Sequence, residues 1–392
     1  MSEIFFKHFP NASGAVFHAF APYRVCPIGA HVDHQHGLVS GFAINKGVDF
    51  FYQPTDGGEI IAYSENFSGM IGFSVRDEVE ELKGDWGDFL RGSVWALKKR
   101  GKLWRGVRGV IKGSLPVGGL SSSASVILCY LQALAQVNDL QFDAQTVIDI
   151  AYRAEKEFVG VSVGKLDHSC EVLSRREHLL FLDTKDQSYE LIKMPDTMPP
   201  FDIVIFYSGL SRRLGATFNN HVDELKAASW YLKALDGRDL GSFSDTRLRD
   251  VPRYVFDRFK DSLPEVFMRR ARHFYTECER VRIGAEAFRQ GDMRTYGRMS
   301  FESGRSSIDD YQTGSPYLVA LYDAFLSAPG VYGGRFSGAG FKGCAVALVD
   351  PDKTEMCVEK VTRDYLTRYP ELKDAYSTHI CTTHDGVGVN VY

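Results

Sequence analysis

The chain has 392 residues, of which 44% are hydrophobic and 24% are charged, and its formal net charge is −4. This length and composition predict a globular protein of two domains and exclude a disordered or fibrous chain. Because positive charge is not in excess, we expect neither a nucleic acid nor an anionic membrane surface as a partner.

Seven cysteines are scattered along the chain without a Cys-x-x-Cys pair. This pattern predicts reduced, buried thiols rather than a zinc site or a disulfide framework. The first residues contain no apolar run typical of a signal peptide, and the chain has no stretch of about 20 apolar residues that would span a membrane. We therefore expect a cytoplasmic protein that is a monomer or a weak homodimer.

The first part of the chain has the pattern of a β-sheet, and helices follow it. Residues 15–112 read as short strands and turns, including the apolar and aromatic segment 42–51 and the β-branched run 107–111. Residues 125–137 are apolar on most faces, which predicts a buried helix, and residues 144–158 alternate apolar and charged positions at helical spacing. The mixture predicts an α+β fold rather than a regular βαβ repeat.

Three prolines at positions 195, 199 and 200 interrupt the chain. They cannot continue a helix or a central strand, because proline lacks the backbone donor and fixes φ. We therefore predict an N-terminal domain of residues 1–198 and a C-terminal domain of residues 199–392. In the second domain we expect a strand over 201–207, helices over 221–327 and a strand over 345–349.

A loop rich in glycine and serine lies between the predicted strand 107–111 and helix 125–137. The free N–H groups and the positive end of the helix dipole favour an anion there, and Gly118 and Gly119 let the backbone approach it closely. We expect a cradle for a di- or triphosphate, although the Gly-Lys-Ser/Thr ending of a Walker A motif is absent. The alternative is that the serines only cap the helix. The candidate phosphate-binding residues are Pro116, Gly118, Gly119, Leu120, Ser121, Ser122, Ser123 and Ala124.

A phosphate site of this kind normally works with Mg²⁺, which prefers hard oxygen ligands such as a hydroxyl and a carboxylate. Ser123 and Glu155 are the candidates for metal ligands. The alternative for Glu155 is an ordinary position on the solvated face of the predicted helix 144–158.

Three residues suited to a hydroxylated ligand fall within ten positions: Arg24, His31 and Asp33. A carboxylate accepts hydrogen bonds from sugar hydroxyls, and an imidazole can donate or accept, so a sugar or polyol fits this segment. The competing interpretation of residues 31–36, which contain three histidines and an aspartate, is a transition-metal site.

Asp167 follows Gly164 in a second turn and is the candidate general base. A carboxylate there could accept the proton of an attacking hydroxyl, and Arg24 nearby would keep it ionised and steady the charge on the transferring group. The alternative for Asp167 is a surface or helix-capping aspartate.

Three segments of the chain together resemble the motifs of the GHMP small-molecule kinases, most closely those of the galactokinase branch. They are residues 22–33, residues 116–124 and residues 336–344, in that order. Galactokinases carry motifs similar to G-R-x-N-L-I-G-E-H-x-D-Y, G-x-G-L-S-S-S-A and G-G-G-F-G-G-C. The resemblance extends over nearly the whole chain and includes residues 86–92, which are similar to the adenine-side segment of the family.

The resemblance implies a two-domain α+β fold with ATP and the acceptor meeting in the cleft between the domains. It implies that Ser123 and Glu155 bind Mg²⁺ and that Asp167 is the catalytic aspartate with Arg24 beside it. It implies sugar contacts from His31, Asp33 and Gly164. The residues implied on the ATP side, besides the phosphate loop, are Trp86, Gly338 and Gly340.

Position 30 departs from galactokinases, which have a glutamate that contacts the sugar's 6-hydroxyl where this chain has Ala30. A carboxylate at C6 would be repelled by that glutamate and tolerated beside alanine. In this respect the chain resembles galacturonokinases, which favours D-galacturonate as the acceptor, with Lys165 or Arg212 as its cationic partner. Phe218 stands where the family has a sugar-contacting tyrosine. D-galactose and L-arabinose are the alternative substrates, and a non-catalytic sensor of sugar and ATP is the alternative function.

Overall fold

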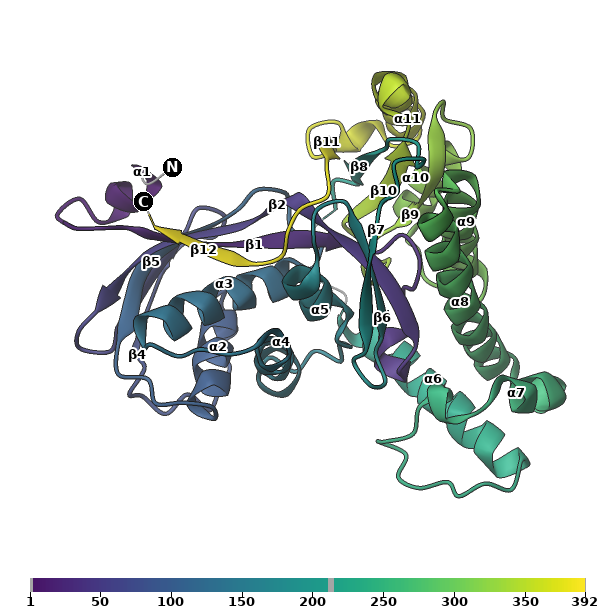
Figure 1. Ribbon diagram of the computed structural model, residues 1–392, viewed down its shortest axis with the longest axis horizontal. Helices are drawn as coiled ribbons and strands as arrows, with labels where there is room; N and C mark the ends of the chain where they lie inside the picture. The colour runs from purple at the N-terminus through teal and green to yellow at the C-terminus, as the bar shows by residue number, and fades with distance from the viewer. Residues whose placement is uncertain (1–2, 211–214, 392) are drawn as a thin grey trace.

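The computed structural model describes residues 3–210 and 215–391, whose strands form two sheets of eight and four strands (Figure 1). The larger sheet has the order β12-β1-β2-β5-β3-β4, with β6 and β7 added beside β2. Its strands are β1 (Phe17–Val25), β2 (Leu38–Thr55), β3 (Glu59–Ser64), β4 (Met70–Ser74), β5 (Gly106–Gly113), β6 (His178–Asp183), β7 (Tyr189–Lys193) and β12 (Gly388–Val391).

Helices cover one face of the larger sheet, with α2, α3 and α4 below β1 and β12 in Figure 1. They are α2 (Asp88–Lys98), α3 (Ser122–Val137), α4 (Ala144–Arg153) and α5 (Leu166–Leu173), while the short α1 (Glu3–His8) lies on the opposite side of the sheet, above it in Figure 1. Helix α3 is apolar on most sides, with Ile127, Leu128 and Leu134 fully buried. Burial of such side chains drives this layer together, because each contributes about 1.5–3 kcal/mol relative to exposure.

The smaller sheet has the order β11-β8-β10-β9, with antiparallel pairing throughout. Its strands are β8 (Asp202–Tyr207), β9 (Val331–Phe336), β10 (Cys344–Val349) and β11 (Ser377–Cys381). The helices are α6 (Gly215–Leu235), α7 (Arg253–Phe259), α8 (Glu265–Gln290), α9 (Met293–Asp309), α10 (Pro316–Phe325) and α11 (Thr354–Arg368). Helices α8 and α9 run side by side along this half of the molecule (Figure 1).

The predicted α+β class is confirmed, and the expected strands and helices correspond closely to β5, α3, α4, β8 and β10. Two details of the region 15–112 were predicted wrongly. Strand β2 is not short but has 18 residues, and it pairs with β1, β5 and β6. Helix α2 lies where only strands and turns were expected, although Leu90, Val94 and Leu97 repeat at helical spacing and are buried.

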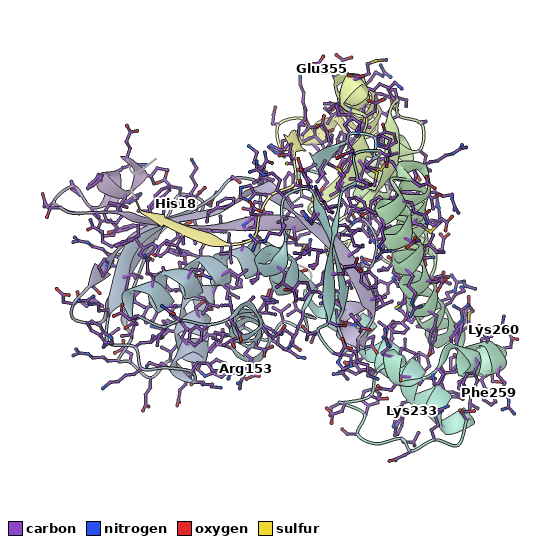
Figure 2. All side chains as sticks on the ribbon, viewed as in Figure 1. His18, Arg153, Lys233, Phe259, Lys260 and Glu355 are labelled. Atoms are coloured by element: carbon purple, nitrogen blue, oxygen red, sulfur yellow. The ribbon has the colours of Figure 1, made fainter. Side chains whose placement is uncertain are left out.

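The division at residue 198 does not account for the end of the chain. Residues 388–391 form β12, which pairs antiparallel with β1, so the last strand belongs to the sheet of the N-terminal part. Figure 2 shows His18 of β1 beside this strand, far from Lys233 and Phe259 at the tip of the other half. The domain limits themselves stay a prediction. No helix within residues 3–210 and 215–391 is long and apolar enough to cross a membrane.

Candidate active site

The loop between β5 and α3 has the backbone geometry expected of a phosphate cradle. Gly118 and Gly119 have φ values of 131° and 87°, a region open to glycine and strained for other residues. Helix α3 begins at Ser122 after Ser121, whose side chain forms no capping hydrogen bond. The alternative that Ser121 caps the helix therefore has no support, and the amides of the first turn could bind an anion.

The third glycine-rich segment lies directly against this loop. A Cβ at Gly343 would lie 2.6 Å from the backbone carbon of Gly118, and one at Gly338 would lie 2.9 Å from the Cα of Gly119. Both glycines also have positive φ, 93° and 70°. The two loops pack backbone to backbone, so a side chain at either position would push them apart. Gly340, by contrast, packs against the Phe336 ring, and its predicted contact with ATP stays a prediction.

Ser123 and Glu155 lie together although 32 positions separate them. The Ser123 hydroxyl donates to Glu155 Oε1 at 2.6 Å, and His168 Nε2 lies 2.9 Å from Glu155 Oε2. Glu155 occupies a π-helical turn, residues 154–158, that continues α4, and only 2% of its surface is exposed. The interpretation of Glu155 as a solvated surface residue is wrong, because the turn aims its carboxylate at the start of α3.

Arg24 and Asp167 form an ion pair in which Arg24 Nε donates to Asp167 Oδ1 at 2.8 Å. Asp167 lies in the first turn of α5, and Arg24 lies near the end of β1, where the strand register shifts between Pro22 and Arg24. Burial raises the pKa of the Asp167 carboxyl, but the guanidinium outweighs burial and holds the pKa below its ordinary value. Asp167 is therefore ionised at neutral pH, and it is not a surface aspartate.

The same arginine also reaches the two glycine-rich loops. Arg24 Nη1 donates to the carbonyl oxygen of Gly119 at 3.2 Å and to Ser337 Oγ at 3.5 Å. Only 5% of the Arg24 surface is exposed. One buried cation thus connects the three segments that carry the resemblance.

Asp33 lies next to this pair, at the turn that contains Gly164. The backbone N–H of Leu166 donates to Asp33 Oδ2 at 3.4 Å, and a Cβ at Gly164 would lie 2.1 Å from the same oxygen. Burial raises the pKa of Asp33 to about 6, with a further contribution from the Asp167 carboxylate. Glycine at 164 is therefore what allows the two turns to meet.

Residues 30 and 31 line the same region. The carbonyl oxygen of Ala30 accepts a hydrogen bond from His273 Nε2 at 3.1 Å if that nitrogen carries the proton. His31 stacks on Tyr311 with ring centroids 4.3 Å apart, and burial lowers the pKa of His31 well below its ordinary value. Among the residues that the structure describes, no group of three or more His, Cys, Asp or Glu side chains could hold a metal ion, so the transition-metal interpretation of 31–36 has no support.

Two further predicted contacts, Lys165 and Trp86, have partners of their own. Lys165 donates to Asp149 Oδ1 at 2.6 Å, so its charge is already paired. Trp86 Nε1 donates to the carbonyl oxygen of Ser68 at 3.2 Å. Arg212 and the side chain of Phe218 lie outside the described residues.

Comparison with known proteins identifies the family. The chain is 36% identical over 380 residues to the galacturonokinase of Arabidopsis thaliana, an alignment that covers 91% of this chain and 89% of that protein. Residues 88–175 match the GHMP kinases N terminal domain, and residues 285–366 match the GHMP kinases C terminal domain. The chain belongs to the GHMP kinase family. The resemblance inferred from its three motifs is thereby confirmed.

Other relatives of this GHMP kinase align with nearly its whole length. The galactokinase of Roseiflexus sp. (strain RS-1) is 32% identical over 371 residues, 94% of this chain and 91% of the relative. The crystal structure of Lactococcus lactis galactokinase complexed with galactose has a TM-score of 0.88 at 28% identity and covers 99% of this chain and 98% of that chain. The fold and the order of the site segments are therefore those of the galactokinase branch.

Sequence reasoning missed the buried charges that hold the first motif in this GHMP kinase. Glu277 of α8 accepts from the backbone N–H of Gly29 at 2.6 Å and from Arg280 Nε at 2.7 Å. Arg335 of β9 lies 3.8 Å from the same carboxylate and is 1% exposed. Arg280 lowers the pKa of Glu277 to about 2 against the effect of burial. A glutamate among buried positions of α8 was the only signal in the sequence.

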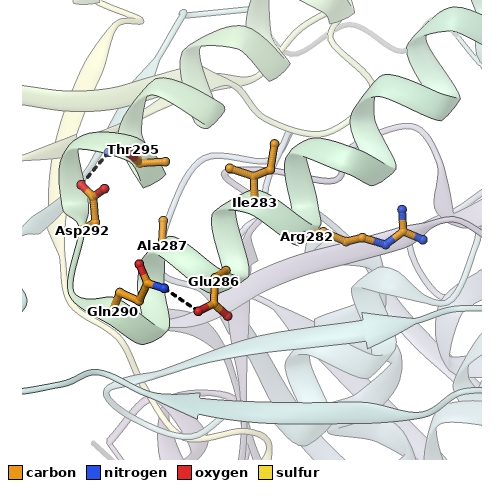
Figure 3. Close-up of a pocket in the computed structure, with 7 residues that line it drawn as sticks. All are labelled: Arg282, Ile283, Glu286, Ala287, Gln290, Asp292 and Thr295. Carbon is orange, nitrogen blue, oxygen red and sulfur yellow. Dashed lines mark hydrogen bonds between the residues drawn. The ribbon is translucent and has the colours of Figure 1, made fainter.

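A surface pocket of this GHMP kinase lies between α8 and α9 (Figure 3), and none of the residues that line it is a predicted site residue. It is lined by Arg282, Ile283, Glu286, Ala287, Gln290, Asp292 and Thr295. Its polar groups bond to one another, as in the 2.6 Å contact from Gln290 to Glu286. The active-site assignment therefore rests on the meeting of the three motifs.

Proposed function

We propose that this sugar kinase transfers the γ-phosphoryl group of ATP to the anomeric hydroxyl of D-galacturonate. The observation that carries the proposal is the buried Arg24, which bonds Asp167 at 2.8 Å and the carbonyl oxygen of Gly119 in the phosphate loop at 3.2 Å. Phosphoryl transfer to a hydroxyl requires a base held close to the bound phosphates. Arg24 connects the proposed base to the phosphate loop.

Each residue then has one task in the reaction. Asp167 accepts the proton of the C1 hydroxyl as that oxygen bonds to the γ-phosphorus, and the bond to the β-phosphate oxygen breaks to release ADP. Arg24 offsets the negative charge that develops on the transferring group. The amides at the start of α3 hold the phosphates in line, and Asp33 accepts hydrogen bonds from sugar hydroxyls.

The oxygen donors at the start of α3 fit Mg²⁺. Ser123 Oγ and Glu155 Oε1 lie 2.6 Å apart, and Mg²⁺ is usually held by one or two protein oxygens together with phosphates and water. We propose that Ser123 and Glu155 would hold the ion, which when bound neutralises charge on the β- and γ-phosphates. His168 Nε2 lies 2.9 Å from the second oxygen of the Glu155 carboxylate, which has no hydrogen-bond partner among the described residues.

Ala30 supports a uronate as the acceptor. It is buried at 9% exposure and presents a methyl group, so position 30 brings no negative charge against a carboxylate at C6. The relative named galacturonokinase, 36% identical, favours the same substrate. D-galactose is the second candidate because other relatives are named galactokinases, and L-arabinose would also fit beside a methyl group.

A non-catalytic sensor has less support. A protein that only bound sugar and ATP would not need a base, yet Asp167 is paired with the buried Arg24 beside the phosphate loop. We also propose that Gly338, Gly340 and Trp86 of this kinase contact ATP. We propose that the kinase is located in the cytoplasm. Its oligomeric state is proposed as a monomer or weak homodimer.

The proposed function is tested by identifying the product of the reaction. Purified protein is incubated with MgATP and D-galacturonate, ADP release is followed, and the product is examined by ³¹P NMR with coupling to the anomeric proton. We expect one phosphate on C1 for each ADP released. ADP release without a sugar phosphate, or phosphate at another carbon, would contradict the proposal, and no turnover with D-galacturonate, D-glucuronate, D-galactose, L-arabinose or mevalonate would favour a sensor.

A further inference from the structure

A cluster of aromatic and imidazole rings lies between the first and third motifs, next to Ala30. Tyr311, which follows the end of α9, stacks on His31 with centroids 4.3 Å apart and meets His221 of α6 edge-on at 5.2 Å. His221 in turn lies 6.0 Å from the ring of Phe341 in the third motif. The cluster thus spans the space between the two motifs on the side of His31.

The cluster contains polar atoms that have no partner. Tyr311 OH, His31 Nε2 and His221 Nδ1 are all buried, and none has a hydrogen-bond partner among residues 3–210 and 215–391. The three residues are 0%, 6% and 7% exposed. Buried polar atoms are nearly always hydrogen-bonded, and leaving one unpaired is costly. Three of them on rings in mutual contact indicate a place for a polar ligand group.

The chemistry of the cluster favours a group that accepts hydrogen bonds. Burial lowers the pKa of both histidines, so the rings are neutral and each can donate from one nitrogen. Tyr311 keeps its proton, because burial raises its pKa far above neutrality. The Arg270 guanidinium lies 5.4 Å from the Tyr311 ring centroid and adds positive potential. Asp33 and Glu224 are the carboxylates whose charges act on Tyr311, and Glu224 is paired with Arg270 at 2.7 Å.

We propose that Tyr311 and His221 donate hydrogen bonds to the C6 carboxylate of the uronate and thereby set the preference for the uronate over a neutral sugar. This inference rests on the proposed function, in which C1 of the sugar lies at Asp167. A carboxylate is an acceptor with two oxygens, so it satisfies both donors. The hydroxymethyl group of D-galactose offers one neutral oxygen, which forms weaker hydrogen bonds than a charged carboxylate does, and L-arabinose has no group there. Tyr311 and His221 are therefore the residues that bind the C6 group of the sugar.

The experiment compares Tyr311→Phe with wild type on D-galacturonate and D-galactose. Phenylalanine keeps the stacking with His31 and removes only the hydroxyl. We expect kcat/KM for D-galacturonate to fall about 10- to 100-fold, and kcat/KM for D-galactose to change by less than about threefold. Dissociation constants from calorimetry replace kinetics for a sugar that is not turned over. Tyr130→Phe is the matched control, because Tyr130 OH is also buried without a partner but lies in the core beside Phe50, and its sugar ratio should not change.

The outcomes separate this inference from the proposed function. A wild type that prefers D-galactose contradicts the proposed substrate and this inference with it. A wild type that prefers D-galacturonate, with an unchanged sugar ratio in Tyr311→Phe, overturns this inference alone. An equal loss for both sugars means that Tyr311 only supports the fold and also overturns it. If Tyr311→Phe does not fold, the ratio of kcat/KM for D-galacturonate to that for D-galactose is measured in His221→Phe instead. The phenylalanine ring keeps the contact with Tyr311.

Discussion

Arg24 Nε donates a hydrogen bond of 2.8 Å to Asp167 Oδ1 across 143 positions of the sequence. The two residues come from the end of β1 and the first turn of α5, which meet only in the folded chain. Because the same guanidinium bonds Gly119 and Ser337, loss of either charge disturbs both the base and the loops that face the phosphates.

Replacing Asp167 with Asn removes the base but keeps a hydrogen-bond acceptor for Arg24. We expect kcat to fall by at least about 10²-fold, with little change in the affinity for ATP. Steady-state kinetics and ATP binding by calorimetry measure the two effects. The matched control is Asp183→Asn, which likewise removes the charge of a carboxylate paired with an arginine, Arg249, but outside the site. Turnover near the wild-type value in Asp167→Asn would remove this residue from the role of base.

Replacing Gly164 with Ala displaces Asp33, because the new Cβ would lie 2.1 Å from Asp33 Oδ2. We expect KM for the sugar to rise by about 10-fold or more while KM for ATP stays within about twofold. The matched control is Gly57→Ala, where the nearest atom lies 4.0 Å away and φ is not positive. Equal changes in the two KM values would mean that Asp33 does not face the sugar.

Replacing Gly343 with Ala separates the second and third glycine-rich loops. The residue has φ of 93°, and its Cβ would lie 2.6 Å from the backbone of Gly118. We expect KM for ATP to rise and the free energy of unfolding to fall by about 1–3 kcal/mol. Urea denaturation and ATP kinetics measure these effects. A variant with unchanged KM for ATP would show that the contact between the loops does not shape the phosphate site.

The Asp33 carboxyl should give the enzyme a pH dependence near pH 6. Its folded-state pKa is raised to about 6 by burial and by Asp167, and the ionised form accepts hydrogen bonds with both oxygens, whereas the protonated form uses one oxygen as a donor. We expect kcat/KM for the sugar to rise with pH through about 6, and Asp33→Asn to lack this rise.

The raised pKa of Asp33 also makes the stability of the fold depend on pH. The folded chain holds the Asp33 proton more tightly than the unfolded chain, whose aspartates titrate near about pH 4. The contribution of Asp33 to the free energy of unfolding therefore decreases as pH rises from about 4 to about 6. Thermal unfolding across this range should show a smaller loss of stability in Asp33→Asn. An equal loss in wild type and variant would contradict the raised pKa.

The three motifs could be predicted from the sequence because their signals are local. The glycines at 118, 119 and 343 stand where positive φ and close backbone approach require them, and Ser123 follows at the start of a strongly apolar helix. The pairing of Ser123 with Glu155 was predicted from their chemistry and the resemblance. It depends on a π-helical turn that no local pattern indicated.

The remaining parts depend on contacts between distant elements. Tyr311 stacks on His31, and His221 of α6 meets Tyr311, only in the folded chain, and neither Tyr311 nor His221 has a motif around it. Glu277 supports Gly29 across 248 positions. Strand β12 has four residues and no pattern that distinguishes the sheet it joins, so its return to β1 could not be read from its sequence.

The most direct test of the account is the ratio of kcat/KM for D-galacturonate to that for D-galactose, measured in wild type and in Ala30→Glu. A new carboxylate at position 30 repels the uronate and gives a hydroxyl an acceptor. The account predicts a wild type that prefers D-galacturonate and a variant whose ratio shifts toward D-galactose by about 1–3 kcal/mol. A wild type that prefers D-galactose, or a ratio that does not move in Ala30→Glu, would contradict it.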